Sequence, residues 1–319
     1  MPNATNQPST RGMTFIQGGE FKMGCEHFYP EEAPVHTVGV DAFWIDSKPV
    51  TVREFRHFVR DTEYVTVAER KPDPAEYPGI DPALLVPGSL VFQRTPGPVP
   101  LTDYRAWWAF VPGACWKRPE GPGSDLRGRD LHPVVHVANE DAVAYAEWAG
   151  KRLPSEAEWE FAARGGLDGA IFTWGEVDHN ETGTLLANTW QGRFPWENLG
   201  AAGWRGTSKV GAFPPNGYGL YDMAGNVWEW TSDFFTTRHP DEAPSPCCVP
   251  HNPRVSSPED SYEVGAPAAH IPRKVIKGGS HLCAPSYCFR YRPAARQAEA
   301  LDSSTSHIGF RCVLDAPST

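Results

Sequence analysis

Two cysteines near the C-terminal end of the chain lie in its densest group of reactive side chains. Cys283 and Cys288 are five positions apart, and His281, Arg290 and Arg292 flank them. Cationic neighbours lower the pKa of a thiol, and the thiolate is the form that acts as nucleophile and binds metals. Soft thiolates select Cu(I), zinc or iron–sulfur clusters over hard cations. The segment therefore predicts either a reactive thiol pair or a thiolate metal site.

The number of nearby ligands narrows the choice of metal. A closed structural zinc site uses four ligands, and only two cysteines lie close together in this segment. A two-thiolate Cu(I) site needs no further protein ligand and suits the pair. Spacing alone leaves two other readings open, namely small buried hydrophobic side chains or an incidental disulfide.

Histidines offer no comparable metal motif. The sequence has no His-Glu-x-x-His segment. His132 and His136 are four positions apart, but Pro133 between them predicts a strand, where this spacing does not bring two imidazoles together. We expect both histidines to be structural.

Charge and cysteine usage set the broad class. The chain of 319 residues carries a formal net charge of −10, which argues against binding to nucleic acid or to an anionic membrane. No apolar run is long enough to span a bilayer, and the polar start lacks the layout of a secretory signal. Seven irregularly spaced cysteines make a poor disulfide framework. We expect a cytoplasmic monomer with reduced thiols.

Composition predicts how these residues are held in place. The chain has 30 Gly and 32 Pro beside 12 Trp. Gly and Pro interrupt helices and strands, whereas buried tryptophans hold irregular loops together. We therefore expect one loop-rich α+β domain over residues 13–319, preceded by a disordered tail over residues 1–12.

Local signals predict three helices and several short strands. Short runs of alternating apolar and polar residues predict strands over residues 13–43. The Pro- and Gly-rich stretch 71–128 predicts one long ordered loop. No helix is expected beyond Gly166. The helices are expected after the capping box of Thr51 and Glu54, from the N-cap Asn139 to Gly150, and from the capping box of Ser155 and Glu158 to Gly165. Further strands are expected at Phe172-Thr-Trp174, and at residues 209–213, 227–231 and 309–313.

Eight further motifs share an order along the chain with one known family. The cysteine segment and these motifs resemble the formylglycine-generating enzymes, the sulfatase-modifying oxidases. The resemblance runs from about residue 13 to the end, and the cysteine pair between Gly-Gly-Ser280 and Arg290-Tyr-Arg292 sets the oxidase branch apart from wider relatives. The motifs are Gly18-Gly-Glu-Phe-Lys-Met-Gly24, Pro49-Val-Thr-Val-Arg-Glu-Phe55, His132-Pro-Val-Val-His136, Lys151-Arg-Leu-Pro-Ser-Glu-Ala-Glu-Trp-Glu160, Asn188-Thr-Trp-Gln-Gly192, Pro214-Pro-Asn-Gly-Tyr-Gly-Leu220, Gly225-Asn-Val-Trp-Glu-Trp230 and Gly309-Phe-Arg-Cys312.

The resemblance implies a fold and a reaction. The fold would be C-type-lectin-like, and Cys283 and Cys288 would bind Cu(I). With O2 as oxidant and a thiol reductant, the enzyme would convert the cysteine of a Cys-x-Pro-x-Arg motif in an unfolded sulfatase to formylglycine. The residues implied around the pocket are the catalytic Ser280 and the substrate-binding Trp228, Tyr287, Arg290 and His307.

The resemblance also implies two calcium sites. Asp222 and Glu229, with Gly225 and Val227, match one of them, and hard oxygen donors in a Gly-containing loop suit Ca2+. The residues alone equally allow that the two carboxylates merely cap turns. The second site matches at Asn188, Thr189 and Trp204, but Ala202 stands where the family has an acidic ligand.

Other departures from the family are local. The family's disulfide partners are replaced by Ala163 and Pro293, which leaves Cys312 alone and favours a reducing compartment. His307 stands where many members have Asn, and the pair Cys247-Cys248 matches nothing in the family.

Two rival functions share this fold. One is an iron-dependent oxidase similar to the ergothioneine-forming sulfoxide synthases, whose helical domain and paired-histidine iron motif have no counterpart in this sequence. The other is a non-catalytic lectin-like binding module. Such a module would be expected to lose one or both cysteines, and both are present here.

Overall fold

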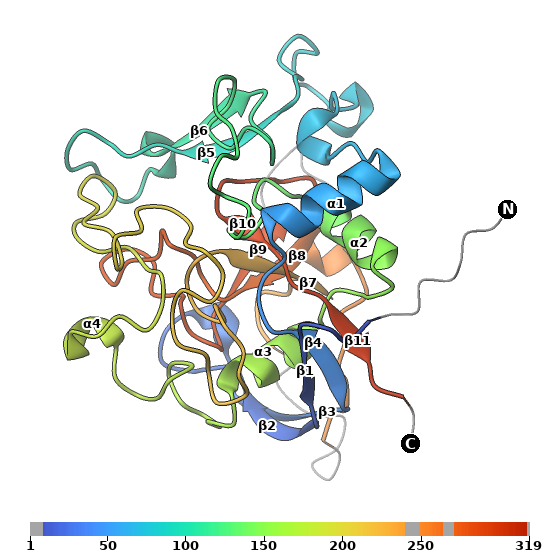
Figure 1. Cartoon of the computed structure of the whole chain (residues 1–319), viewed down its shortest axis with the longest axis vertical. Coiled ribbons are helices and arrows are strands. Elements are labelled where there is room, and N and C mark those ends of the chain that lie inside the picture. Colours follow the sequence, from blue (N-terminus) through green and yellow to red (C-terminus); the bar gives the residue numbers. More distant parts are fainter. Residues whose placement is uncertain (1–8, 240–248, 264–270, 318–319) are drawn as a thin grey trace, which may run out of the picture.

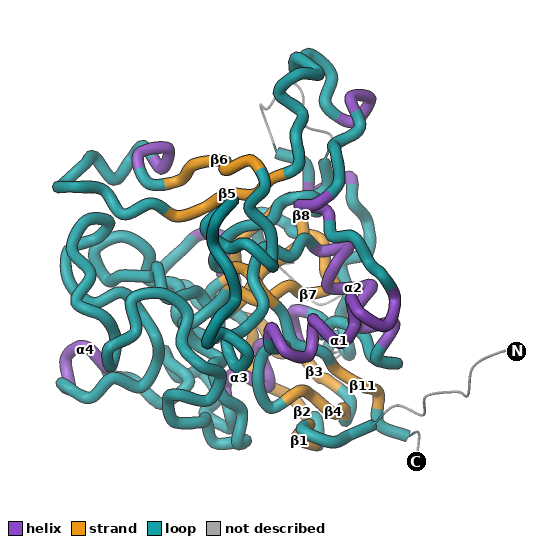
Figure 2. Tube along the Cα trace, turned by 45° about the horizontal axis from the view of Figure 1, so that its top comes forward, coloured by secondary structure: helices purple, strands orange, loops and turns teal. Residues whose placement is uncertain are grey.

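Most of the chain is irregular backbone held between short elements (Figure 2). The computed structural model describes residues 9–239, 249–263 and 271–317. The expected loop-rich α+β architecture is confirmed, whereas the tail predicted over residues 1–12 and the pair Cys247-Cys248 fall largely or wholly outside the described residues. No helix in the described part of the chain is long and apolar enough to cross a bilayer. The helices are α1 Val52–Thr62, α2 Asn139–Trp148, α3 Glu156–Arg164 and α4 His179–Thr182, with 3-10 turns at Pro30–Glu32, Val67–Glu69, Pro74–Glu76, Tyr104–Ala106 and Glu259–Ser261.

The strands form four small sheets (Figure 1). The largest has the order β10-β7-β8-β9, in which only the β10–β7 pair is parallel. A second sheet has the order β1-β4-β11, and β2–β3 and β5–β6 are two-stranded pairs. The strands are β1 Met13–Ile16, β2 Gly19–Met23, β3 His36–Val40, β4 Phe43–Asp46, β5 Gly88–Phe92, β6 Trp108–Pro112, β7 Trp228–Phe234, β8 Arg273–Lys277, β9 Arg296–Ala300, β10 Ile308–Gly309 and β11 Val313–Asp315.

The N-terminal ends of α1 and α3 are capped as the sequence predicts, whereas that of α2 is not. Thr51 caps α1 and Ser155 caps α3, each in a capping box with a Glu three residues on. The predicted N-cap of α2 is wrong, because Asn139 is already the first helical residue. The carboxylate of Asp141 instead accepts the Ala138 N–H at 2.8 Å, which satisfies one of the free N–H groups of the helix end.

Several predicted strands and loops need correction. Phe172 makes only an isolated bridge to Gly175, and residues 209–213 form turns, so neither segment is a strand. Within the described residues a short α-helix, α4, does occur beyond Gly166, and Asp178 accepts the Asn180 N–H at its start. The stretch read as one long loop contains the β5–β6 hairpin, which lies at the opposite end of the molecule from β2 and β3 (Figure 1).

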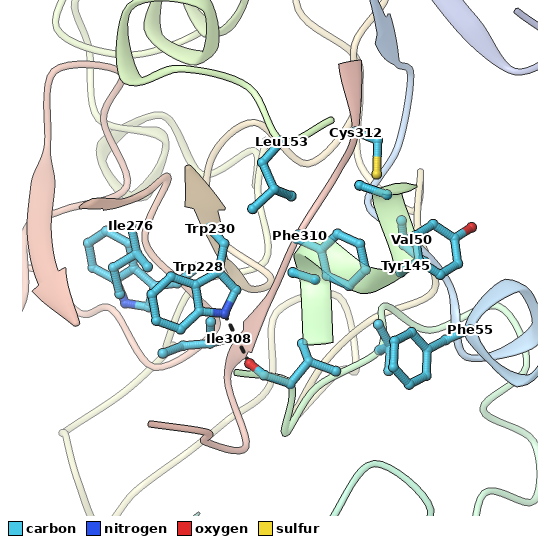
Figure 3. Close-up of a cluster of buried hydrophobic side chains, with 14 of the residues drawn as sticks. Val50, Phe55, Tyr145, Leu153, Trp228, Trp230, Ile276, Ile308, Phe310 and Cys312 are labelled. Carbon is cyan, nitrogen blue, oxygen red and sulfur yellow. Dashed lines mark hydrogen bonds between the residues drawn. The ribbon is translucent and has the colours of Figure 1, made fainter. Parts of the chain in front are cut away.

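Aromatic side chains fill the core between the large sheet and the α1–α2 pair (Figure 3). Trp228 and Trp230 of β7 are almost fully buried, and the indole N–H of Trp230 donates to the Val137 carbonyl at 3.0 Å. Burial of such rings removes large apolar areas from water while the polar edge keeps a partner. Cys283 and Cys288 belong to the same buried cluster. The core therefore reaches directly beneath the cysteine loop.

Candidate functional site

The two predicted cysteines meet in the loop that follows β8. Their Sγ atoms are 3.0 Å apart, and the side chains are almost entirely buried. Two successive turns make this contact: the N–H of Cys283 donates to the Ser280 carbonyl at 2.9 Å, and that of Cys288 donates to the Ala284 carbonyl at 2.8 Å. The expectation that the two sulfurs lie together is confirmed.

The pair does not hold its two protons equally. Burial, followed by the hydrogen bond and charge of its neighbour, raises the pKa of Cys283 well above the ordinary thiol value. The hydrogen bond from Cys283 lowers the pKa of Cys288, and the nearby Arg290 guanidinium lowers it further. Cys288 is therefore the more acidic thiol of the pair, and Cys283 holds its proton more tightly. The backbone N–H of Ser280 also points at the Cys283 sulfur, at 3.4 Å.

Arg290 is held beside Cys288 by a segment that sequence reasoning did not single out. Its guanidinium binds the Glu31 carboxylate at 2.7 Å and stacks 3.7 Å from the centroid of the Tyr29 ring. The Tyr29 hydroxyl accepts the Phe289 N–H at 3.0 Å. The buried Nε of Arg290 has no hydrogen-bond partner among the described residues. This arrangement leaves the Nε donor of a partly buried cation available to an anion at the sulfur pair.

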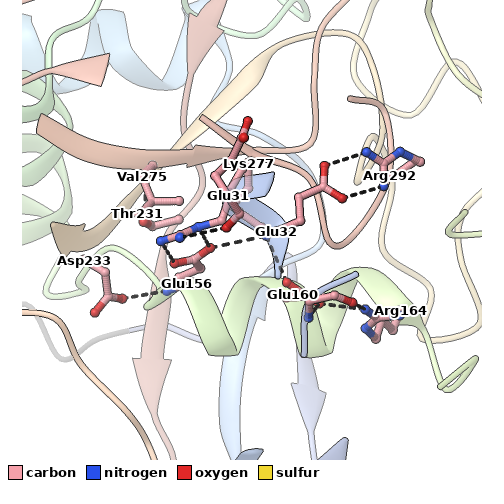
Figure 4. Close-up of polar contacts among 12 residues, drawn as sticks. Glu31, Glu32, Glu156, Glu160, Arg164, Thr231, Asp233, Val275, Lys277 and Arg292 are labelled. Carbon is pink, nitrogen blue, oxygen red and sulfur yellow. Dashed lines mark hydrogen bonds and ion pairs between the residues drawn. The ribbon is translucent and has the colours of Figure 1, made fainter. Parts of the chain in front are cut away.

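A buried ionic network fixes the segment that carries Arg290 (Figure 4). The Arg292 guanidinium makes two hydrogen bonds to the Glu32 carboxylate, at 2.8 and 2.5 Å. Arg296 binds Glu156 of α3 in the same two-point manner, at 2.7 and 2.8 Å. Such forked pairs restrict both position and orientation. They lock the residues that follow Cys288 against the N-terminal segment and α3.

The predicted pocket residues occupy different positions around the sulfurs. Ser280 is fully buried, and its hydroxyl accepts the Leu282 N–H at 3.2 Å. Trp228 belongs to the same buried cluster as the two cysteines, and its backbone N–H donates to the His307 carbonyl at 2.9 Å. Tyr287 is 37% exposed, which makes it the accessible member of the group. His307 packs against Trp108, with the ring centroids 4.8 Å apart.

Several aromatic rings pack beside Tyr287, and most of them were not predicted from the sequence. The ring of Phe194 stacks on Tyr287 with centroids 4.4 Å apart, and Trp107 meets both rings edge-on. Trp190 packs edge-on against Phe194 and donates its backbone N–H to the Cys283 carbonyl at 2.9 Å. The density of tryptophans in the sequence was the available signal, but it did not reveal which of them converge on the cysteines.

The donor set fits a soft monovalent ion. Two metal–thiolate bonds of about 2.3 Å can span up to about 4.6 Å, so one ion can meet both sulfurs. Nowhere in the described residues do three or more His, Cys, Asp or Glu side chains form a metal-binding group. A Cu(I) ion between two thiolates carries a net charge of −1, and Arg290 lies where it balances that charge. The residues therefore fit copper better than zinc.

The first predicted calcium site is only partly open to an ion. Burial, with a smaller contribution from the nearby Glu229, raises the pKa of the Asp222 carboxyl to about 6. The Glu229 carboxylate accepts hydrogen bonds from the Arg311 guanidinium, at 2.6 and 2.8 Å, and from the Trp159 indole, at 2.8 Å. Three of its roughly four acceptor positions are thus taken. Asp222 is the better-placed ligand of the two carboxylates.

The second predicted calcium site is marked by an unsatisfied oxygen. The Oδ1 atom of Asn188 is buried and has no hydrogen-bond partner within the described residues, while its Nδ2 donates to the Gly206 carbonyl at 2.9 Å. An orphaned buried oxygen suits a hard cation. The Asn188 carbonyl also accepts the N–H of Asn226, at 2.8 Å, so this loop contacts the segment that starts at Asp222. Thr189 follows Asn188 directly, and the Trp204 ring packs on His132.

Comparison with known proteins covers nearly the whole chain. The family described as "Sulfatase-modifying factor enzyme 1-like domain" matches residues 1–316. A Mycobacterium tuberculosis protein named "Formylglycine-generating enzyme" is 55% identical over 94% of this chain and 96% of its own length. A bovine protein named "Inactive C-alpha-formylglycine-generating enzyme 2" is 37% identical over 96% of this chain and 89% of its own.

One solved structure resembles the fold. PvdO from Pseudomonas aeruginosa has a TM-score of 0.60 at 22% sequence identity, and the likeness covers 98% of this chain and 96% of that one. At this identity the likeness concerns the fold alone. It agrees with the loop-rich α+β architecture described above.

Proposed function

The chain belongs to the sulfatase-modifying factor family, and from this premise we propose that it is a formylglycine-generating enzyme that oxidises a cysteine of a sulfatase polypeptide. The reaction takes one substrate cysteine side chain, one O2 and two thiols of a reductant. It gives the aldehyde of formylglycine, hydrogen sulfide, water and one disulfide. Four electrons reach O2, two from the substrate Cβ and two from the reductant.

The buried contact between Cys283 and Cys288 carries this proposal. Both sulfurs would hold Cu(I), which when bound supplies the one-electron chemistry with O2 that amino-acid side chains lack. The chain favours that site by lowering the pKa of Cys288, so that its proton is the easier of the two to lose when both sulfurs become ligands. Arg290 balances the remaining negative charge from its position against Glu31 and Tyr29.

The surroundings of the sulfurs suit a bound polypeptide. Core rings pack beneath the loop and exclude water from one side, while the partly exposed Tyr287 presents an aromatic face on the other. An extended Cys-x-Pro-x-Arg segment can pack its proline against such a face and leave its own thiol at the sulfurs. Ser280 contacts the Cys283 sulfur through its backbone N–H and would lie beneath the bound thiol, and His307 packs against Trp108.

Calcium and location are further parts of the proposal. Asp222 and the orphaned Asn188 oxygen would bind Ca2+ and so join the two loops that meet behind the cysteine segment. A reducing, cytoplasmic compartment suits five cysteines that are free in the described residues.

Mass spectrometry of a modified peptide tests the activity. Copper-loaded protein is incubated with a Cys-x-Pro-x-Arg peptide under air, and we expect an oxygen-dependent product in which sulfur is replaced by the aldehyde oxygen. Cys283→Ser and Cys288→Ser should abolish the product. Cys115→Ser is the matched control, because Cys115 is equally buried but lies elsewhere in the fold. Product formation that survives in both site variants would reject these residues, and a total absence of product would favour a non-catalytic role.

A further inference from the structure

A second cavity borders the cysteine loop. Its volume is about 340 Å³, within the range of ligand pockets. The lining includes His281, which lies two residues before Cys283, so the two Cα atoms are at most about 7 Å apart. Phe92 also lines the cavity and packs edge-on against Trp190, whose N–H donates to the Cys283 carbonyl. The cavity and the sulfur pair are therefore immediate neighbours.

The charge of this cavity is opposite to that of the whole chain. Arg129 and Arg205 line it with a single carboxylate, that of Glu120, which binds Arg129 at 2.6 Å. Arg205 is exposed and has no ion-pair partner in the part of the chain that the structure describes. Lys209 is near enough to act on His132 of the cavity wall. An unpaired cation thus faces a pocket in a protein whose net charge is −10.

Two hydrogen-bonding side chains lie beside Arg205 in the cavity. His132 and Thr207 line the cavity together, and the Nδ1 and Oγ1 atoms are 3.0 Å apart. When the hydroxyl donates to Nδ1, the other ring nitrogen carries a proton and can donate. A guanidinium fork next to a neutral donor matches the geometry of a carboxylate.

We propose that the cavity lined by Arg205, Thr207 and His132 binds an acidic side chain of the substrate polypeptide, a few residues from the cysteine that is oxidised. The inference rests on the proposed function, because it requires a polypeptide whose thiol lies at the sulfur pair. An extended chain advances about 3.3 Å per residue, so a Glu or Asp two to four positions before the substrate cysteine can reach the neighbouring cavity while the Pro and Arg of the motif stay in place. A chain that carries such a residue gains an ion pair that a neutral peptide lacks.

Binding measurements test the inference without any turnover. Fluorescence anisotropy gives Kd for labelled peptides in which the substrate cysteine is alanine, the Pro and Arg of the motif are kept, and each position before the cysteine carries Glu or Gln in turn. We expect Glu to bind about three- to tenfold more tightly than Gln at one position, the range expected of a charge-assisted hydrogen bond at a partly exposed site. In Arg205→Gln this ratio should fall to about one. The matched control is Arg11→Gln, since Arg11 is exposed and lies outside the cavity.

A charge swap separates recognition from a structural role. Arg205→Glu should reverse the preference, so that Lys at the same peptide position binds more tightly than Glu. Equal Kd values for Glu and Gln at every position would overturn the inference, even if the peptides are oxidised normally. The KM of a thiol reductant that carries a carboxylate is compared with that of the neutral dithiothreitol. If Arg205→Gln changes only the KM of the carboxylate-bearing reductant, the inference is also overturned, because the cavity would then bind the reductant. If the parent protein did not oxidise the peptides at all, the proposed function would be rejected. The Kd values of the Glu and Gln peptides would still decide the inference about the cavity.

Discussion

Replacing Glu32 by alanine should destabilise the protein strongly, because it leaves the buried Arg292 guanidinium without its ionic partner. The Glu32 carboxylate and the Arg292 guanidinium are 0% and 1% exposed, and two hydrogen bonds join them. Burial raises the pKa of Glu32 despite this partner, which shows how costly an unpaired charge is at this position. The pair links the N-terminal segment to the loop that follows Cys288 (Figure 4).

The size of the effect follows from this burial. Removing one partner of a buried pair costs about 3–5 kcal/mol, since the other charge stays desolvated. At about 2–3 °C per kcal/mol for a chain of this size, Tm should fall by about 6–15 °C. Glu31→Ala is the matched comparison, because the Glu31–Arg290 pair is about 20% exposed and should cost only about 1 kcal/mol.

Calorimetry on the single and double variants gives the result. The double variant Glu32→Leu with Arg292→Met should recover much of the lost stability, because no unpaired charge remains. A Glu32→Ala variant within 1 kcal/mol of the parent protein would refute the reasoning. So would a double variant as unstable as the sum of the two single ones.

Three further outcomes are expected. Gly279→Ala should displace the cysteine loop and lower stability by about 1–3 kcal/mol in thermal unfolding, because the backbone has φ +68° and the added Cβ would lie 2.9 Å from the Arg290 carbonyl oxygen; an unchanged Tm would contradict this. In metal-free protein, peptide mapping after iodoacetamide should find Cys288 alkylated before Cys283 and at a lower pH, because the pKa of Cys288 is lowered and that of Cys283 is raised, and the reverse order would contradict the proton assignment. Calcium should raise Tm at pH 7.5 but less at pH 5, because protons compete for a carboxylate whose pKa is about 6; Asp222→Asn should lose this effect, and a calcium response that persists in that variant would count against the site.

Local signals in the sequence predict local structure well. The capping boxes at Thr51 and Ser155 lie within one turn of the chain, and both form as expected. Cys283 and Cys288 are likewise close in sequence, and two turns are enough to join them. The sequence therefore locates the sulfur pair and two of the helices that surround it.

Contacts between distant segments escape this reasoning. Glu32 and Arg292 are 260 positions apart, so nothing in the sequence connects them. Strand β8 was missed because its last residue, Lys277, is buried and pairs with Glu160 at 3.0 Å, which breaks the expected alternation of apolar and polar residues. Glu229 is a second example. The sequence predicts it as a calcium ligand, but its carboxylate is bound by Arg311, 82 positions further along the chain.

X-ray absorption at the copper edge of anaerobic, Cu(I)-loaded protein tests the central claim most directly. The account predicts two sulfur neighbours around one copper ion per chain, unchanged in Cys115→Ser and reduced to one at most in Cys283→Ser or Cys288→Ser. Copper surrounded by nitrogen or oxygen, or a sulfur shell that is the same in all three variants, would contradict it.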